Sequence, residues 1–329
     1  MKYPRINVKS MQKTGEIIDN SFKIMKHGLK TLFISFAVMI FPFSSVFYFL
    51  YSNFMGKFTG NMEASEFEQP EFWINFGLVF LLVMIMMLVI FNVIELIPVN
   101  YILLYERTDD YTTITPVSLI KLTLKRILKM IWGNFLKNFL FFVFLSVIIF
   151  FVVIIGIIIA LALSFSFESA FSGHPLLAAL MAILIFFAVI AIYIFLFLLY
   201  APLMLFPIIY FREERGVISS ILRCFELVKG EWWKTFGLMV LMYLIISSIA
   251  SILYIPLYSV IVTSLIQQKT VEYASVSYIV SSIIGSISFF IYFIGSFSMS
   301  LKYYHLVEKN EGASLDERLS ALPVQENPA

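Results

Sequence analysis

One acidic side chain, Glu95, stands inside a long apolar run, in the stretch FNVIELIPVNY. Asn92 lies about one helical turn before it and Asn100 follows, so this run contains a candidate intramembrane polar site formed by Asn92, Glu95 and Asn100. A charge within a membrane span costs about 2.5 to 3.5 kcal/mol on insertion scales, which makes such a residue a functional candidate. Two interpretations stay open for Glu95: structural pairing, for example with a lysine of a neighbouring helix, or coupling to a substrate or a proton.

The other reactive side chains do not form a catalytic pattern. The three histidines, His27, His174 and His305, are far apart in the sequence, and Cys224 is the single cysteine. This spacing indicates neither a metal cluster nor an acid–base pair, and no phosphate loop, dinucleotide fingerprint or nucleophile elbow is present. We therefore expect a protein that is not an enzyme and that uses no cofactor, catalytic residue or metal.

Composition indicates a membrane protein. Of the 329 residues, 60% are hydrophobic and only 13% are charged, an apolar share that one soluble domain cannot bury. Apolar runs of 18 residues or more are typical of membrane-spanning helices, since about 20 residues cross the hydrocarbon core. The sequence predicts an all-α polytopic fold with six spans, at residues 31–52, 74–104, 138–164, 176–209, 235–265 and 274–303.

The positions of lysine and arginine predict the orientation. Twenty-one of the 23 basic residues fall on the side that holds both termini, and the other side has only Lys57 and Lys269. The positive-inside rule then places both termini in the cytoplasm. The first span begins after about 30 residues and runs past the length of a signal-peptide core, so we expect it to be retained.

A repeated motif divides the chain into thirds. The stretch WGNFLKNF, at residues 132–139, recurs as KGEWWKTF at residues 229–236, and each opens a long apolar run. An amphipathic segment precedes both, GEIIDNSFKIMKHGLK near the N-terminus repeats the design, and each third ends in tyrosine followed by mixed charge. We predict three hairpins, each preceded by a cytoplasmic-face amphipathic helix. The single membrane domain 1–329 would hold pseudo-repeats 11–107, 115–212 and 216–312 and a short cytoplasmic tail, 313–329.

The amphipathic segments supply the candidate contacts to lipid or to a partner. Lysine-rich helices lie in the membrane interface, and tryptophan is most stable at headgroup depth. These helices either anchor the hairpins or gather anionic lipids or a partner protein at the cytoplasmic face. The candidate contact residues are Lys121, Lys125, Arg126, Lys129, Arg223, Trp232, Trp233 and Lys234.

Prolines and small residues mark two further features of the spans. Pro98 frees a backbone carbonyl in the second span, and Pro202 and Pro207 favour a bend in the long fourth one. The last hairpin is rich in serine and glycine, which predicts close helix packing around the sixth span or, alternatively, a polar crevice. The third span, nearly pure Ile, Phe, Val and Leu, is predicted to face lipid.

Three stretches carry a resemblance to a known family: TGEIIDNSFKIMKHGLKTLF, SSILRCFELVKGEWWKTFGLMV and YYHLVEKNEGASLDERL. The chain resembles the bacterial family named after the membrane domain of glycerophosphoryl diester phosphodiesterase, and related multi-span proteins. Members that are enzymes carry a separate (β/α)₈ barrel of about 250 residues, and here only some 25 residues follow the last span. The resemblance therefore implies the membrane module alone, without phosphodiesterase activity.

Two functions from different classes remain open. The first is a non-catalytic scaffold, assembly or regulatory subunit of a bacterial membrane process, located in the cytoplasmic membrane. Its expected partners are anionic lipid headgroups and other membrane or cytoplasmic proteins, and not nucleic acid. The alternative is a transporter or permease-like subunit for a lipid, peptide or small solute, which Glu95, the prolines and the serine-rich last hairpin favour.

Overall fold

The chain is helical wherever its structure is described. The computed structural model describes residues 5–46, 69–171, 175–266, 283–284 and 287–312, and these ranges contain no strand. The helices are α1 (Thr14–His27), α2 (Leu29–Met39), α4 (Pro70–Arg107), α5 (Pro116–Phe171), α6 (Pro175–Tyr200), α7 (Phe206–Arg212), α8 (Val217–Val228), α9 (Trp232–Ile266) and α11 (Tyr292–Glu311). Short 3-10 turns lie at Tyr111–Thr113, Ala201–Leu205 and Phe289–Ile291. The predicted all-α class is confirmed.

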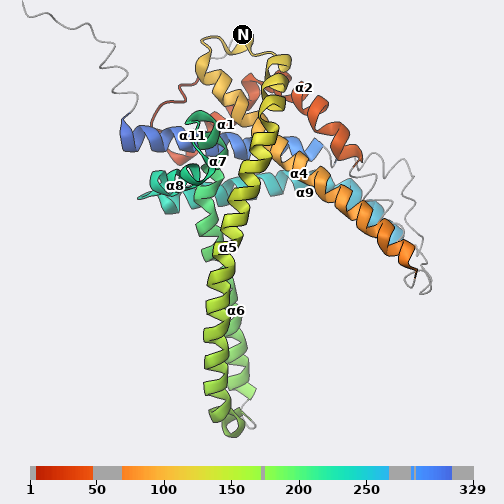
Figure 1. Ribbon diagram of the computed structural model, residues 1–329, viewed down its shortest axis with the longest axis vertical. Coiled ribbons are helices and arrows are strands. Elements are labelled where there is room, and N and C mark those ends of the chain that lie inside the picture. The colour runs from red at the N-terminus through yellow and green to blue at the C-terminus, as the bar shows by residue number, and fades with distance from the viewer. Residues whose placement is uncertain (1–4, 47–68, 172–174, 267–282, 285–286, 313–329) are drawn as a thin grey trace, which may run out of the picture.

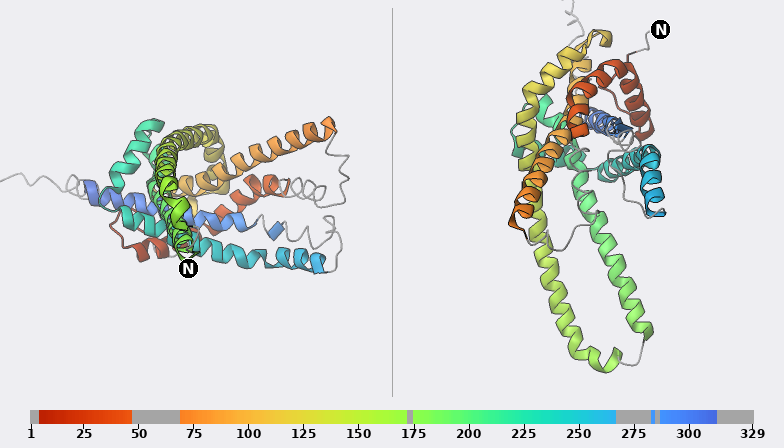
Figure 2. Two further views of the ribbon diagram at one scale, coloured as in Figure 1. Left: turned by 90° about the horizontal axis from the view of Figure 1, so that it is seen from below. Right: turned by 90° about the vertical axis from the view of Figure 1, so that its right-hand side faces the viewer.

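The helices form two groups that meet at one junction (Figure 1). Helices α2, α4 and α9 extend to one side, α11 crosses the junction, and α5 and α6 form a hairpin that projects in another direction (Figure 1 and Figure 2). Between the groups lie α1, α7, α8, the turn that leads into α9 with the first turn of α9, and the C-terminal halves of α4 and α11, which together we call the collar. The expected hairpins therefore do not all stand parallel to one another.

Four of the described helical segments are long and apolar enough to cross a membrane: Phe72–Arg107, Pro116–Phe150, Phe186–Arg212 and Trp232–Ile255. They correspond to the second to fifth expected spans. The expected first span contains α2, which has only 11 residues, and its part beyond residue 46 lies outside the described residues. The expected sixth span overlaps α11 but begins in residues that the structure does not describe. The count of six stays a prediction.

Two of the three predicted amphipathic segments are separate helices. Helix α1 ends at Gly28, whose N–H donates to the Ile24 carbonyl at 3.1 Å, and α2 follows directly. Helix α8 is separated from α9 by a turn in which Gly230 has a φ of 88°, a conformation that favours glycine.

The second segment differs, because it is continuous with the span. Helix α5 runs without a break from Pro116 to Phe171, over 56 residues. The prediction of a separate surface helix before Lys137 is therefore wrong. Gly133 does not make a turn here, and it serves instead for close packing. A Cβ on Gly133 would lie 2.9 Å from Cε1 of Tyr210 and 3.2 Å from Cζ of Phe206.

Gly28 has the same kind of neighbour as Gly133. A Cβ on Gly28 would collide with the ring of Tyr101, which belongs to α4. Each glycine thus contacts a tyrosine ring from the end of the same third of the chain, Tyr101 of α4 for Gly28 and Tyr210 of α7 for Gly133. Gly230 has open space around it, because it forms a turn instead.

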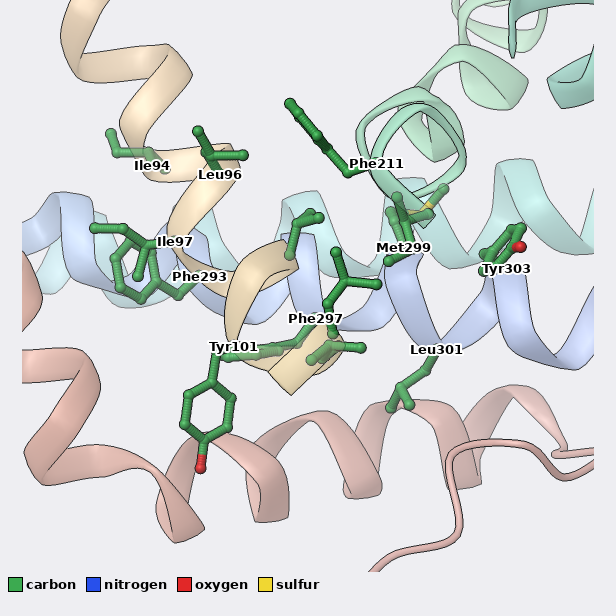
Figure 3. Packing of buried hydrophobic residues seen from close by; sticks show 14 of the residues in the cluster. Ile94, Leu96, Ile97, Tyr101, Phe211, Phe293, Phe297, Met299, Leu301 and Tyr303 are labelled. Carbon is green, nitrogen blue, oxygen red and sulfur yellow. The ribbon is translucent and has the colours of Figure 1, made fainter. Parts of the chain in front are cut away.

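The core lies where α4 and α11 cross above α1 and α2 (Figure 3). The Tyr101 side chain extends from α4 toward α1, and its ring meets the Phe297 ring at 6.0 Å between centroids. Phe36 and Phe293, both buried, pack edge to face at 6.1 Å. A last hairpin able to pack closely was expected, and Gly295 of α11 indeed lies against Ile246.

The prolines act as their positions predict in the fourth span. Pro202 lies in the 3-10 turn after α6, and Pro207 lies in the first turn of α7, where no helical N–H is needed. The fourth span is thereby interrupted before it reaches the collar. Pro98 lies inside α4, whose 38 residues form one helix from Pro70 to Arg107.

The α5–α6 hairpin exposes apolar side chains that no other element covers. Phe142 is 65% exposed and Phe186 is 62% exposed. Large exposed apolar surfaces mark interfaces with lipid or with other proteins. The expectation of a lipid-facing third span agrees with this exposure over residues 138–150.

The glycine–tyrosine contact gives a first test. We expect Gly28→Ala to lower the free energy of unfolding by about 1–3 kcal/mol, because an added methyl group overpacks the contact with Tyr101. Gly77 of α4 provides a matched control, since a Cβ there has open space around it. Gly77→Ala should be neutral or stabilising by up to about 1 kcal/mol, as alanine favours the helix. Thermal unfolding in detergent measures both variants, and equal melting temperatures would contradict the packing role of Gly28.

Candidate functional site

Asn92 and Glu95 point from α4 toward α5, where Asn134 joins them. The Asn134 amide donates to Asn92 Oδ1 at 2.9 Å and to Glu95 Oε2 at 3.0 Å, and the Asn92 amide donates to the Leu88 carbonyl at 2.7 Å. Asn134 Oδ1 is buried and has no hydrogen-bond partner among the described residues. Glu95 is thus bound by a neutral amide, in place of the lysine that the sequence suggested.

Asn100, the third predicted polar residue, also binds α5. Its Oδ1 accepts from Arg126 Nη1 at 2.7 Å, and its amide donates to Thr123 Oγ1 at 3.1 Å. The Arg126 guanidinium also stacks over the Phe211 ring at 5.1 Å. Arg126 is therefore a half-buried contact between helices, whereas the sequence suggested a contact to lipid or a partner.

A groove of about 900 Å³ opens beside these contacts, between α4 and α5. The groove is polar at one end, where Glu95, Asn134, Lys137 and Asn138 line it, and apolar elsewhere. Lys137 is only 3% exposed, and its ammonium lies 5.3 Å from the Phe206 ring centroid and 5.9 Å from that of Tyr200. Within the described ranges this ammonium forms no ion pair.

The ends of the three predicted repeats meet in the collar. Glu106, at the end of α4, accepts two hydrogen bonds from Arg212 of α7, at 2.7 and 3.1 Å. Tyr304 of α11 donates to the same carboxylate at 2.5 Å, and Lys9 lies 3.7 Å from it. A bidentate arginine–carboxylate pair fixes orientation as well as distance. This contact holds the three thirds of the chain in one arrangement.

Arg223 belongs to a second ion network in the collar. The sequence placed Arg223 among the lipid or partner contacts, but its side chain is buried and paired with Glu213, Glu226 and Glu311. Burial alone lowers the pKa of Arg223, and the three carboxylates outweigh this and raise it above its ordinary value. Arg223 is therefore a structural cation between α7, α8 and α11, because the apolar side chains Ile218 and Leu222 take the outer face of α8.

Glu231, in the turn before α9, forms the third network. Its carboxylate accepts from Lys302 at 2.6 Å, from Lys309 at 2.5 Å and from Lys234 at 3.2 Å. Burial alone raises the pKa of Glu231, but the ammonium groups dominate and hold it well below the usual range. Lys302 is 2% exposed, so removal of Glu231 would leave a buried cation without its partner.

His305 completes this third network and is neutral in it. Its Nδ1 accepts from the Gln12 backbone N–H at 3.1 Å, which leaves Nε2–H to donate to Glu231 at 3.2 Å. Burial lowers the pKa of His305, and Lys302 lowers it further. The contact ties the segment before α1 to α11.

Three of the basic residues of α5, Lys121, Lys125 and Lys129, lie on its outer face. Lys121 and Lys125 are exposed and form no ion pair among the described residues, and their contact with lipid or a partner stays a prediction. Lys129 is also exposed, with its ammonium 4.7 Å from the Tyr210 ring centroid. Apolar side chains share this surface. The exposed residues of what we call the α5 face are Lys121, Lys125, Val117, Leu124, Leu128 and Trp132.

The two tryptophans that open α9 differ in their surroundings. Trp232 is half-buried, and its indole N–H donates to the Leu198 carbonyl at 2.8 Å. Trp233 is 70% exposed and Lys234 is exposed beside it, although Lys234 also pairs with Glu231. Of the predicted contacts at this position, Trp233 presents the most surface to a membrane or partner.

Side chains of the types that bind metals do not cluster in the described residues. No group of three or more His, Cys, Asp or Glu side chains that could hold a metal ion occurs within those ranges. Burial raises the pKa of the Cys224 thiol to about 12, so this cysteine stays protonated and unreactive at neutral pH. His174 lies outside the described residues.

Sequence reasoning missed Glu106, Arg212, Glu231 and Lys302 as members of buried networks. A signal for them existed, because each lies in a recurring stretch: three in the tyrosine-and-charge endings and Glu231 in the KGEWWKTF motif. What the sequence lacks is the pairing, since the partners lie 71 to 198 positions apart.

Comparisons with known proteins add no relative. No family model matches the chain, and no curated protein or solved structure matches it.

The neutral His305 predicts a pH dependence. Because its pKa is lower folded than unfolded, the unfolded chain binds the additional proton first as pH falls below about 6.5. We expect the melting temperature in detergent to fall between pH 7.5 and pH 5.5, and to fall less in His305→Gln. His27 has a lowered pKa as well, through burial and Lys26, but it is present in both proteins and cancels in the comparison. An identical pH slope in the variant would contradict the assignment to His305.

Proposed function

We propose that the chain is a non-catalytic integral membrane protein that acts as a scaffold, assembly or regulatory subunit of a bacterial membrane process. The observation that carries this proposal is the contrast between the collar and the α5 face. Glu106, Arg212, Arg223 and Glu231 are paired inside the collar, whereas Lys121 and Lys125 point outward beside exposed apolar side chains. A fixed frame with one basic and apolar outer surface is suited to hold a partner.

In this proposal six helices cross the bacterial cytoplasmic membrane, both termini are cytoplasmic, and the collar lies at the cytoplasmic side. The four long apolar helices and the lysine and arginine distribution support it. The lengths also agree, because α4 has 38 residues, about 57 Å of helix, which exceeds the hydrocarbon core of about 30 Å. Such a helix tilts in the membrane or extends beyond it into the collar.

Anionic headgroups are the lipid chemistry that the α5 face would meet. Lysine stems lie along apolar surface while their ammonium groups reach toward the phosphates, and Trp132 suits headgroup depth. The same surface accommodates a membrane or cytoplasmic protein. The resemblance to the membrane module of glycerophosphoryl diester phosphodiesterases fits a non-catalytic role of this kind.

The double variant Lys121→Gln/Lys125→Gln tests the role of the α5 face. Each basic residue near an anionic surface contributes about 1 kcal/mol, so we expect retention of anionic lipid and of partner protein to fall by one order of magnitude or more. Affinity purification of the full chain in mild detergent, with bound lipids and proteins quantified, gives the measurement. Lys229→Gln is the control, because Lys229 is exposed at the turn after α8 and is not one of the residues of the α5 face. Unchanged co-purification in the double variant would refute the scaffold role.

The groove supports a second candidate function, a transporter or permease-like subunit for a lipid, peptide or small solute. Its specific support is that Glu95 and Lys137 line one groove at the polar end of apolar walls. In a transporter, Glu95 would bind the moving substrate or its coupled proton.

Glu95→Gln separates the two functions. Glutamine has nearly the size of glutamate and keeps an oxygen that accepts from Asn134. We therefore expect the variant to fold, with a free energy of unfolding within about 1 kcal/mol of wild type. If the protein transports, substrate movement into reconstituted vesicles is lost in this variant. Normal folding together with unaltered movement would exclude Glu95 from transport.

A further inference from the structure

The polar end of the groove holds charges and acceptors that protein groups leave incompletely paired. Glu95 has one described partner, Asn134, which binds Oε2 only. Asn134 Oδ1 is an unpartnered acceptor on a side chain that is 8% exposed. Lys137 is 3% exposed and contacts aromatic rings instead of a carboxylate. Buried cations and buried acceptors without partners are costly, so each of these groups favours a ligand.

Together these groups favour a zwitterionic ligand, which carries both a positive and a negative charge. Glu95 and Asn134 Oδ1 both accept hydrogen bonds, and the carboxylate also favours positive charge. Lys137 favours negative charge, and the exposed Asn138 beside it adds an amide donor. A ligand with an N–H-bearing cation and a phosphate a few atoms apart satisfies both sides at once.

The remainder of the groove fits an acyl chain. From Glu95 the lining continues along α4 through Phe91 and Leu88 to Met84, and Phe139 and Phe142 face it from α5. Eleven residues of helix separate Glu95 from Met84, which is about 16 Å. One leaflet of a hydrocarbon core is about 15 Å deep. The polar end and the apolar end are thus one leaflet apart.

We propose that this groove binds one phospholipid with a primary-amine headgroup, of the phosphoethanolamine type. The ammonium donates to Glu95 and to Asn134 Oδ1, the phosphate pairs with Lys137, and an acyl chain lies between α4 and α5. The proposal rests on the proposed placement of α4 and α5 in a bilayer, with the polar end toward the headgroups, and it does not require the scaffold role of the α5 face.

Headgroup chemistry distinguishes this lipid from its relatives. A choline headgroup carries the charge but has no N–H to donate, so Asn134 Oδ1 stays unpaired. A glycerol headgroup offers a phosphate to Lys137 but no cation to Glu95. The groove therefore selects the amine, and a surface that only attracts anionic lipid does not.

The test measures the headgroup preference of the wild-type full chain. The protein in mild detergent receives an equimolar mixture of phosphatidylethanolamine, its N-methyl and N,N-dimethyl derivatives, phosphatidylcholine and phosphatidylglycerol, all with the same acyl chains. Native mass spectrometry then quantifies the bound lipid. We expect retention to fall with each N–H lost, to at least tenfold lower for choline than for ethanolamine. Equal retention of all five lipids, or preference for phosphatidylglycerol, would overturn the proposal.

Two variants and one competitor locate the site. Glu95→Gln should reduce the ethanolamine-to-choline ratio at least threefold, and Lys137→Gln should reduce retention of every phospholipid, while Lys30→Gln, an exposed lysine outside the groove, leaves the ratio as in wild type. A ratio in Glu95→Gln equal to wild type would place the selectivity elsewhere and overturn the assignment.

Water-soluble glycerophosphoethanolamine should compete poorly with the bound lipid. Displacement at equal concentration would show that the groove recognises a free headgroup and not a lipid.

Discussion

The arrangement of the described helices depends on the Glu106 carboxylate and its pairing with Arg212. The two residues come from different thirds of the sequence, and Tyr304, from the last third, donates to the same carboxylate. Removing a carboxylate and a guanidinium from water costs free energy. Only their mutual attraction and further hydrogen bonds offset this cost. The apolar helices of the three thirds, whose packing alone has little directional preference, are thereby fixed in relative position at the collar. The Arg223 and Glu231 networks extend this frame along α8, α9 and α11.

The same principle explains where the helices separate. The first half of α5 forms polar contacts with α4, through Arg126 to Asn100 and Asn134 to Asn92. Beyond Phe139 the described side chains of α5 are nearly all apolar, so nothing directional attaches the rest of the helix to α4. The α5–α6 hairpin consequently projects away from the other long helices (Figure 1), and the groove opens where α4 and α5 part. The acyl chain of a lipid fits such a groove between two diverging apolar helices.

Much of the fold follows from composition and periodicity, and less of the site does. Long apolar runs predicted the helical class and four helices that are long and apolar enough to cross a membrane, because these properties depend on the length and hydropathy of a run alone. Asn92, Glu95 and Asn100 were recognisable, since polar groups are rare in such runs. Their partners were not, because Asn134 lies 39 positions from Glu95 and pairing depends on how two helices cross. The prediction that Arg223 contacts lipid or a partner was wrong for a related reason. A charged side chain was expected at the surface, and only the fold brings Glu213 and Glu311 next to it.

The difference between the two copies of the repeated motif accounts for the groove. In KGEWWKTF the glycine makes a turn, and Glu231 and Lys234 lie in the collar, where Lys302 neutralises the carboxylate. In WGNFLKNF the glycine packs against Tyr210, so the helix continues and carries Asn134 and Lys137 down beside α4. Asparagine stands where the other copy has glutamate, and the lysine consequently loses the carboxylate that its counterpart has three residues away. In KGEWWKTF the lysine and the carboxylate thus find their partners within the protein. WGNFLKNF instead leaves the Lys137 ammonium without a carboxylate and Asn134 Oδ1 without a donor at the polar end of the groove, and in our proposal a zwitterionic headgroup provides both.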